Sequence, residues 1–242
     1  MNAIKTINLT KKYKDKIAVN NLNLEIKDGE LFSLLGVNGA GKTTTIKMLS
    51  CLIKPSSGDA FLLGDSIIKD SSKVKEKINI SPQETAIAPN LTTIENLETM
   101  ARIYGSPKEE AKEKAKDMMK KFKLMEVEKS RAKILSGGYQ RRLSIAMALI
   151  TNPKILFLDE PTLGLDVIAR HELLEIIKSL KGKVSIILTT HYLEEAQSLS
   201  DRIGIMVRGD LRVIGTASEI ILREKAKCFE DAFIKIAQQG GN

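Results

Sequence analysis

The chain has 242 residues, 43% of them apolar, which is enough to bury one sizeable core. No segment approaches the run of about 18 apolar residues that a membrane-spanning helix needs, and the N-terminus lacks the apolar stretch of a secretory signal, so we expect a cytosolic protein. The formal net charge of +8 favours an anionic ligand, an anionic membrane surface or nucleic acid, but only 4% of residues are aromatic, which leaves few stacking platforms for single-stranded nucleic acid.

Two segments near the N-terminus, 3–9 and 17–26, alternate apolar and polar side chains. Such alternation is typical of half-buried strands. The turn expected between them, Lys11–Asp15, contains Tyr13. A tyrosine at this place is either an ordinary ring at a strand edge or a platform on which a nucleotide base stacks.

A glycine-rich segment, Gly-Val-Asn-Gly-Ala-Gly-Lys-Thr, lies between an apolar run at 31–35, which has the pattern of a buried strand, and a helix expected over 42–52. Its glycines let successive N–H groups point into one concavity, and the helix adds its own unpaired N–H groups. Lys42 can reach the β- and γ-phosphates of a nucleotide, and the Thr43 hydroxyl can ligate Mg²⁺. Thr44 is expected to contact the α-phosphate. The segment therefore predicts a site for a nucleotide triphosphate.

The middle of the chain predicts a change from strands to helices. Short strands are expected over 60–63 and 78–81, and the pattern becomes helical from Thr92. Ser106-Pro-Lys-Glu109 has the form of a capping box with proline at the first helical position. Behind it, four apolar residues share one helical face: Ala111, Ala115, Met118 and Phe122. Residues 92–150 are therefore expected to form a helical subdomain inserted into an α/β core.

The last third of the chain alternates strands with helices. Strands are expected over 155–158, 184–190, 202–207 and 210–215, and helices over 167–181 and 192–199. This alternation predicts a mainly parallel sheet covered by helices, with the last two strands paired across a turn. Residues 1–91 and 151–222 are thus expected to form the α/β core, and 223–242 a short helical tail that ends in Gly-Gly-Asn.

Two carboxylates, Asp159 and Glu160, follow the buried strand at 155–158. Open α/β sheets bind ligands at this end of their strands. Asp159 is placed to hold Mg²⁺, directly or through water, and Glu160 to orient or deprotonate the water that attacks the γ-phosphate. His191 ends the next strand, either as a hydrogen-bonded strand-end histidine or as a contact to the γ-phosphate; its place in the alternation favours the second interpretation.

A second helix start begins at Ser136, which has the character of an N-cap. The helix runs for roughly 14 residues, about 20 Å at 1.5 Å per residue, and leads directly into the strand before Asp159. Its start therefore cannot easily fold back onto the glycine-rich loop of its own chain. Ser136 is either a plain helix N-cap or part of a helix start that caps the nucleotide of a second chain. The sequence favours the second interpretation, in which two chains form a two-fold, head-to-tail dimer that holds two ATP molecules.

The order of these motifs resembles that of ATP-binding cassette ATPases, the nucleotide-binding subunits of ABC transporters, over about residues 4–222. The resemblance implies a P-loop NTPase core of the α/β class, with an N-terminal antiparallel β part and an α-helical subdomain, and the cofactors ATP and Mg²⁺. It also implies that Tyr13 stacks on adenine. Gln83 corresponds to a glutamine that links Mg²⁺ and water to the transmembrane partner, and Asp166 to the D-loop aspartate.

The site residues that the resemblance implies fall into three groups. The catalytic residues are Glu160, His191 and Lys42. The nucleotide-binding residues are Tyr13, Gly36, Asn38, Gly39, Ala40, Gly41, Lys42, Thr43, Thr44, Gln83, Ser136, Gly137, Gly138 and Asp166. The metal ligands are Thr43, Gln83 and Asp159. One position departs from the family pattern, because the fifth residue of the signature is usually glutamine and is Tyr139 here, followed by Gln140.

The segment 189–196 further resembles single-cassette subunits of drug, lipid or polysaccharide exporters. The resemblance implies an ATPase that dimerises with itself or a homologue around two Mg-ATP. It would power a membrane permease on a separate chain and lie peripherally on the cytoplasmic face of the membrane, without nucleic acid. The alternatives are a non-transport cassette ATPase acting on nucleic acid or ribosomes, and a protein that holds ATP without hydrolysing it.

Overall fold

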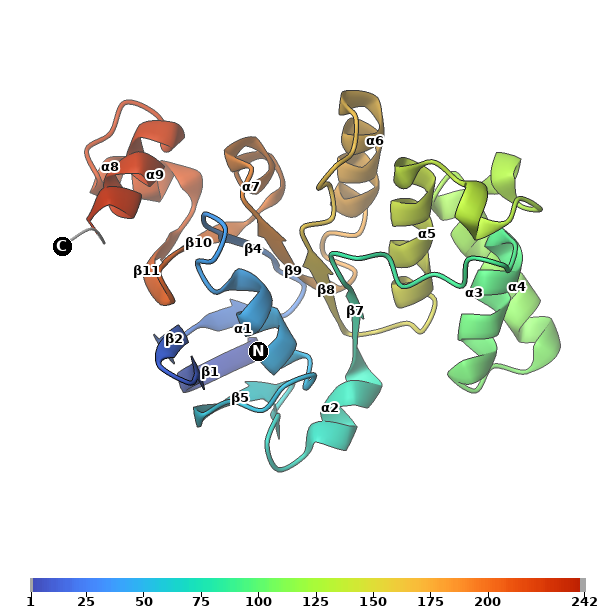
Figure 1. Ribbon diagram of the computed structural model, residues 1–242, viewed down its shortest axis with the longest axis horizontal. Helices are drawn as coiled ribbons and strands as arrows, with labels where there is room; N and C mark the ends of the chain where they lie inside the picture. The colour runs from blue at the N-terminus through green and yellow to red at the C-terminus, as the bar shows by residue number, and fades with distance from the viewer. Residues whose placement is uncertain (1, 240–242) are drawn as a thin grey trace.

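A six-stranded sheet runs through the middle of the protein, whose residues 2–239 are described by a computed structural model (Figure 1). Five strands are mutually parallel, and the edge strand β11 pairs antiparallel with β10. In spatial order the strands are β11 (Asp210–Gly215), β10 (Arg202–Val207), β4 (Leu31–Leu35), β9 (Ser185–Thr190), β8 (Ile155–Asp159) and β7 (Ile78–Ser81). Every residue of β4, β8 and β9 is buried, as expected for strands covered on both faces. The expected α/β class with a mainly parallel sheet is confirmed.

A second, antiparallel sheet is formed by the N-terminal part of the chain. Its strands are β1 (Asn2–Tyr13), β2 (Lys16–Leu22), β3 (Glu25–Lys27), β5 (Ser57–Leu62) and β6 (Asp65–Ser66). The single strand expected over 17–26 is therefore wrong, because it is divided into β2 and β3. The division occurs where the ladder with β1 becomes irregular, and the Asn23 side chain accepts a 2.9 Å bond from the Asn8 N–H there. The expected turn shortens to two residues because β1 continues to Tyr13.

Four helices flank the α/β core: α1 (Lys42–Leu49), α2 (Ser71–Lys77), α6 (Val167–Lys178) and α7 (Leu193–Leu199). Helix α1 ends three residues before the expected Leu52. Cys51 adopts a left-handed φ of 58°, and the Leu52 N–H bonds back to the Lys47 carbonyl at 2.9 Å. This left-handed turn closes the helix, as glycine does at many helix ends.

The helical segment comprises α3 (Thr93–Ile103), α4 (Lys108–Lys121), the 3₁₀ turns η1 (Met125–Val127) and η2 (Ala132–Ile134), and α5 (Gly137–Leu149). Figure 1 shows α3 and α4 at one end of the molecule, with α5 between them and the sheet. One apolar cluster extends from α3 and α4 through α5 to β8. Helix α5 therefore belongs to the packing of both the helical part and the sheet.

The expected capping box at Ser106 is wrong. Pro107 is extended with ψ 157°, so α4 begins at Lys108 without a side-chain cap. The Ser106 N–H already donates to the Ala101 carbonyl at the end of α3, which leaves the Glu109 carboxylate no N-cap donor, and Glu109 pairs with Lys112 instead. Capping boxes form at Thr92–Glu95 and at Thr216–Glu219. Along α4, Met119 rather than Met118 is buried with the other expected apolar residues.

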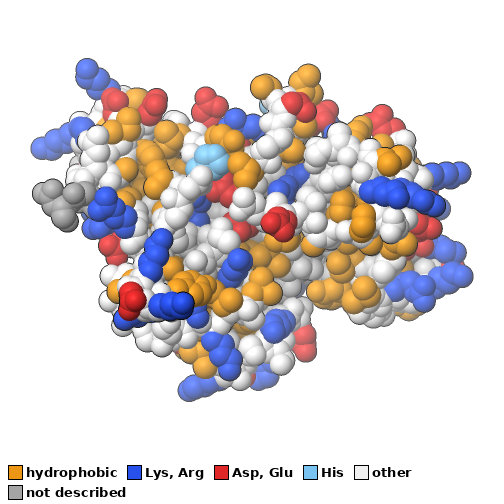
Figure 2. Space-filling model, viewed as in Figure 1, with side chains coloured by type: hydrophobic (Ala, Val, Ile, Leu, Met, Phe, Trp, Pro, Cys, Tyr) orange, Lys and Arg blue, Asp and Glu red, His pale blue; other side chains and the backbone are white. Residues whose placement is uncertain are grey.

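The C-terminal part adds α8 (Ala217–Arg223) and α9 (Phe229–Gln238), which pack beside β10 and α7. The final Gly-Gly-Asn of the expected tail lies outside the described residues. Among residues 2–239, no helix combines the length and apolar character needed to cross a bilayer. On the face shown in Figure 2, Lys and Arg side chains are spread over both ends and the middle of the molecule rather than gathered in one groove.

Candidate functional site

The glycine-rich loop connects the end of β4 to the start of α1, and its glycines are required by its geometry. Gly39 and Gly41 have left-handed φ values of 81° and 107°. A Cβ on Gly41 would lie 2.4 Å from the Ala18 carbonyl oxygen, and one on Gly36 would lie 2.5 Å from the Met206 carbonyl oxygen. No other residue type fits so close to a neighbouring backbone. The loop is thus held against β2 and β10.

A cavity of about 470 Å³ lies over this loop. Its volume is within the usual range for small-molecule sites. Eleven of the predicted site residues line it: Tyr13, Asn38, Gly39, Ala40, Gly41, Lys42, Thr43, Thr44, Gln83, Glu160 and His191. Lys16, Ala18 and Leu163 line it as well and were not predicted. Lys16 and Ala18 lie two residues apart on β2, a spacing that puts them on one face but carries no chemical signal of its own.

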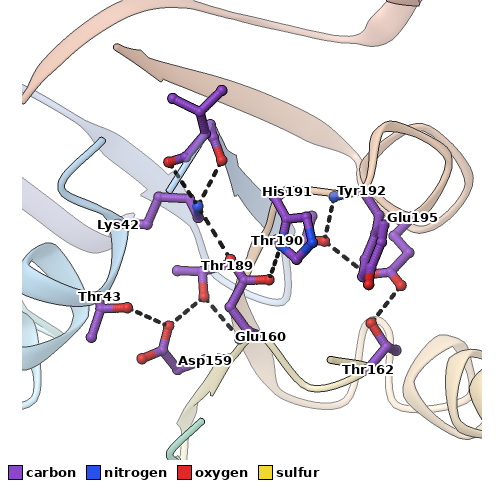
Figure 3. A network of polar contacts seen from close by, with 12 residues as sticks. Lys42, Thr43, Asp159, Glu160, Thr162, Thr189, Thr190, His191, Tyr192 and Glu195 are labelled. Carbon is purple, nitrogen blue, oxygen red and sulfur yellow. Dashed lines mark hydrogen bonds and ion pairs between the residues drawn. The ribbon is translucent and has the colours of Figure 1, made fainter. Parts of the chain in front are cut away.

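Lys42 lies at the centre of the site with 6% of its surface exposed. Its ammonium donates to the Gly36 carbonyl at 2.6 Å and the Val37 carbonyl at 3.3 Å, and lies 3.2 Å from Glu160 Oε1 (Figure 3). A buried ammonium needs such partners because desolvation is costly. Gly36 itself does not line the cavity, and its contribution to the site is this carbonyl.

Thr43 and Asp159 form a small group of oxygen ligands beside Lys42. The Thr43 hydroxyl donates to Asp159 Oδ1 at 3.1 Å, and the Thr189 hydroxyl donates to the same oxygen at 2.6 Å. Within residues 2–239, no three His, Cys, Asp or Glu side chains cluster to form a complete metal cage. Mg²⁺ commonly takes one or two protein oxygens and completes its shell with phosphates and water, so a hydroxyl and a carboxylate fit it.

Glu160 and His191 are hydrogen-bonded to each other across the ends of β8 and β9. Glu160 Oε2 lies 2.8 Å from His191 Nδ1. Glu160 has a left-handed φ of 47°, and its N–H donates to the Thr189 hydroxyl at 3.0 Å. A non-glycine residue rarely adopts this conformation, and such backbone strain is concentrated at functional sites. The turn directs the buried carboxylate toward Lys42 and His191 (Figure 3).

Gln83 reaches the cavity from the loop after β7, and Arg141 of α5 holds that loop in place. The Arg141 guanidinium donates to the Pro82 carbonyl at 2.7 Å and also to the Gln83 carbonyl. Burial lowers the pKa of Arg141, and the charge of Asp159 opposes that shift. The loop that carries Gln83 is therefore bonded to the helix that starts at Ser136.

The predicted residues Ser136, Gly137, Gly138 and Asp166 lie outside the cavity. In Figure 1, α1 and α5 lie on either side of β8. Ser136 is exposed at the start of α5, and within the described residues its side chain makes no capping bond. Gly138 packs on α6, where a Cβ would come within 2.8 Å of Ala169 Cβ. Asp166 caps α6, accepting bonds of 3.0 Å from the N–H groups of residues 168 and 169.

Tyr139 and Gln140 are both bonded within their own chain. The Tyr139 hydroxyl contacts Glu126, and its ring lies 4.5 Å from the Arg142 guanidinium carbon. The Gln140 amide donates to the Leu135 carbonyl at 3.1 Å and the Ala132 carbonyl at 3.3 Å. The Gln140 amide is therefore bonded to its own chain and does not replace the glutamine that the family usually has at the position of Tyr139.

Comparison with known proteins finds relatives that are ATP-binding or transporting proteins. The profile of the family described as ABC transporter matches residues 19–163. The linearmycin resistance ATP-binding protein LnrL of Bacillus subtilis is 42% identical over 217 residues, 89% of this chain and 70% of LnrL. The human phospholipid-transporting ATPase ABCA3 is 41% identical over 212 residues, 88% of this chain but 12% of ABCA3. The daunorubicin/doxorubicin resistance protein DrrA of Streptomyces peucetius is 37% identical over 219 residues, 90% of this chain and 66% of DrrA.

Solved structures share the fold over nearly the whole chain. An ATP-binding subunit of an ABC transporter superposes with a TM-score of 0.86 at 26% identity and covers 97% of this chain and 99% of its own. The ATP-binding cassette MJ0796, solved as a dimer in a post-hydrolysis state with ADP and Pi, superposes with a TM-score of 0.80 at 29% identity, covering 88% of this chain and 98% of its own. The expected P-loop NTPase fold is thereby confirmed.

Proposed function

Because the chain belongs to the ABC transporter family of ATP-binding cassettes, we propose that it hydrolyses ATP in the cavity over its glycine-rich loop to power solute export by a separate permease. The observation that carries this proposal is the convergence of Lys42, Thr43, Asp159, Glu160 and His191 at the carboxyl ends of three neighbouring parallel strands. That is the edge at which open α/β sheets bind ligands.

We assign the steps of hydrolysis to these side chains. Tyr13 stacks on the adenine, while the loop N–H groups and Lys42 bind the phosphates. Thr43 and Asp159 hold Mg²⁺, which when bound neutralises charge on the β- and γ-phosphates. Glu160 orients the attacking water and accepts its proton, and His191, held by Glu160 at 2.8 Å, contacts the γ-phosphate. Gln83, which reaches the cavity from the loop after β7, would supply a further oxygen ligand to the metal.

We propose that the start of α5 caps the nucleotide of a second copy. Ser136 and Gly137 are exposed, are not among the residues that line the cavity of their own chain, and lie at the start of a helix whose unpaired N–H groups suit phosphate oxygens. Asp166, at the start of α6, would lie beside them in the same interface. The dimeric cassette MJ0796 with ADP and Pi supports this arrangement.

The relatives support an exporter. LnrL and DrrA are named for resistance to antibiotics and ABCA3 for phospholipid transport. We propose that residues 92–150 form the subdomain that, with Gln83, passes the motion of the dimer to a permease at the cytoplasmic face of the membrane, and that 1–91 with 151–222 form the ATP-binding core. On the face shown in Figure 2, the basic side chains are spread out and do not gather in one groove that would suit nucleic acid.

The test is the Glu160→Gln variant, assayed for turnover and for mass in solution with Mg-ATP. Loss of the general base is expected to lower turnover by at least about 100-fold while an ATP-bound dimer accumulates. A second variant, Glu160→Gln with Ser136→Arg, places a bulky charge at the proposed contact and is expected to remain monomeric. Turnover near that of the parent in Glu160→Gln would contradict the catalytic assignment, and a dimer in the double variant would contradict the role of Ser136.

A further inference from the structure

Glu195, on the inner side of α7, is a completely buried carboxylate that the mechanism above does not use. Three donors surround it: the Thr162 hydroxyl at 2.5 Å, the Thr190 hydroxyl at 2.9 Å and Arg170 Nε at 2.8 Å. A charged group without water must be paired and hydrogen-bonded in this way. Its two oxygens have different partners: Oε1 accepts from Thr162 and Arg170, and Oε2 accepts from Thr190.

The two threonines belong to the two catalytic segments of the site (Figure 3). Thr162 follows Glu160 by two residues, and Thr190 directly precedes His191. The Thr190 hydroxyl also accepts a 3.0 Å bond from the N–H of Tyr192, so it fixes the chain on both sides of the histidine. One carboxylate therefore connects the backbone that carries Glu160 to the backbone that carries His191.

A second route leads from Glu195 to the histidine ring. Arg170, its ion-pair partner, places its guanidinium carbon 4.4 Å from the centroid of the Tyr192 ring. That ring lies 4.1 Å from the centroid of the His191 ring. The guanidinium thus packs against the Tyr192 ring and is itself bound by Glu195.

Stability alone does not explain such a group, because a buried ion pair contributes little more than well-packed apolar residues would. We propose that Glu195 is a positioning residue, which holds Glu160 and His191 in register so that the 2.8 Å bond between them is maintained during hydrolysis. This inference rests on the proposed roles of Glu160 and His191. It adds a third carboxylate to the site, one that acts only through Thr162, Thr190 and Arg170.

The first experiment compares Glu195→Gln with Glu194→Gln. The amide keeps the size of the side chain but turns an NH₂ donor toward groups that are themselves donors. Its neighbour Glu194 is a matched control, since its side chain is 92% exposed and lies 3.8 Å from Arg170. With kcat normalised to the amount of nucleotide bound, Glu195→Gln is expected to lose about 10-fold or more, as small misplacements of catalytic groups do. KM for ATP is expected to change less than twofold in both variants, and kcat of Glu194→Gln to stay at the parent value.

The second experiment separates positioning from packing. Thr190→Val keeps the shape and removes the hydroxyl, whereas Thr190→Ser keeps the hydroxyl, so serine is expected to retain normalised kcat and valine to reduce it. A normalised kcat within twofold of the parent in both Glu195→Gln and Thr190→Val, with lowered melting temperatures, would assign Glu195 to packing alone and overturn the inference. A parent without ATPase activity would instead contradict the proposed function.

Discussion

At the scale of single residues, Tyr13 is the side chain on which we propose that the nucleotide base stacks. It lines the cavity at the end of β1, with 47% of its surface exposed, and the Lys11 ammonium lies 5.1 Å from the ring centroid. The exposed ring offers a stacking surface, and stacking of a base on an aromatic side chain contributes about 1–3 kcal/mol with little base preference.

Tyr13→Ala is therefore expected to weaken binding of a fluorescent ATP analogue by about 10-fold, equivalent to about 1.4 kcal/mol, and to weaken binding of the GTP analogue equally. Tyr13→Phe, which keeps the ring, is the control and is expected to bind within twofold of the parent. An unchanged affinity in Tyr13→Ala would show that the ring is an ordinary strand-edge residue.

The grouping of the candidate site residues was predictable from sequence wherever a residue's chemistry is specific to its position. The glycine-rich loop, the two carboxylates after β8 and His191 all carry such chemistry, and the structure brings them together. Lys16 and Ala18 could not be predicted, because a lysine or alanine on a half-buried strand has many ordinary reasons to be there. Glu195 was not recognised either, since its three partners come from segments up to 33 residues away along the chain.

At the scale of the elements, α3 and α4 differ in how they begin. Thr92 caps α3 by accepting from the Glu95 N–H at 3.3 Å, while the Glu95 carboxylate accepts from the Thr92 N–H at 2.7 Å. At α4, Ser106 makes no such bond, and its hydroxyl accepts from the Lys114 ammonium at 2.9 Å.

Thr92→Ala is accordingly expected to lower the free energy of unfolding by about 1 kcal/mol, whereas Ser106→Ala is expected to change it by less than about 0.5 kcal/mol. Chemical denaturation of the two variants beside the parent measures both values. An equal loss in the two variants would mean that Ser106 does cap α4 in solution.

The pair also illustrates which elements sequence patterns predict. Strands at 31–35, 78–81, 202–207 and 210–215 were predicted at their observed bounds, because each is a short segment of apolar or alternating apolar and polar residues. The capping box at Ser106 was wrong although its pattern is sound, because the end of α3 already uses the required N–H. That competition depends on a neighbouring element, which a local pattern does not contain.

At the scale of the whole molecule, three large apolar side chains are unusually exposed beside the proposed dimer contacts. Val167 and Ile168, at the start of α6 after Asp166, are 83% and 74% exposed, and Ile134, just before the α5 start, is 70% exposed. These residues flank the segments that would meet a second copy, and burying them would add to its affinity.

Val167→Glu, made in the Glu160→Gln background, is expected to weaken the ATP-dependent dimer by at least about 10-fold, because the interface would bury an unpaired charge. Leu222→Glu, at an equally exposed apolar position on α8, is the control. Analytical ultracentrifugation with Mg-ATP gives both dissociation constants. A dissociation constant for Val167→Glu equal to that of its parent would show that the start of α6 is not part of the dimer interface.

The arrangement of parts was only partly predictable at this scale. The alternation of strands and helices predicted the parallel sheet, because a helical crossover returns the chain to the same edge of the sheet and the next strand then runs in the same direction. Where α9 packs was not predictable from its own spacing: Phe229, Ala232 and Ile236 form an apolar stripe, but their partners on β10 lie more than 20 residues earlier in the chain.

The ion pair between Lys42 and Glu160 has one more consequence for the cycle that we propose. In that cycle, a polyphosphate and the Glu160 carboxylate would compete for the same ammonium, so that binding of the nucleotide would withdraw the counter-charge from the carboxylate. Binding of the nucleotide and release of the general base from Lys42 would then occur in the same step, so that the base is free to accept a proton only while the nucleotide is bound.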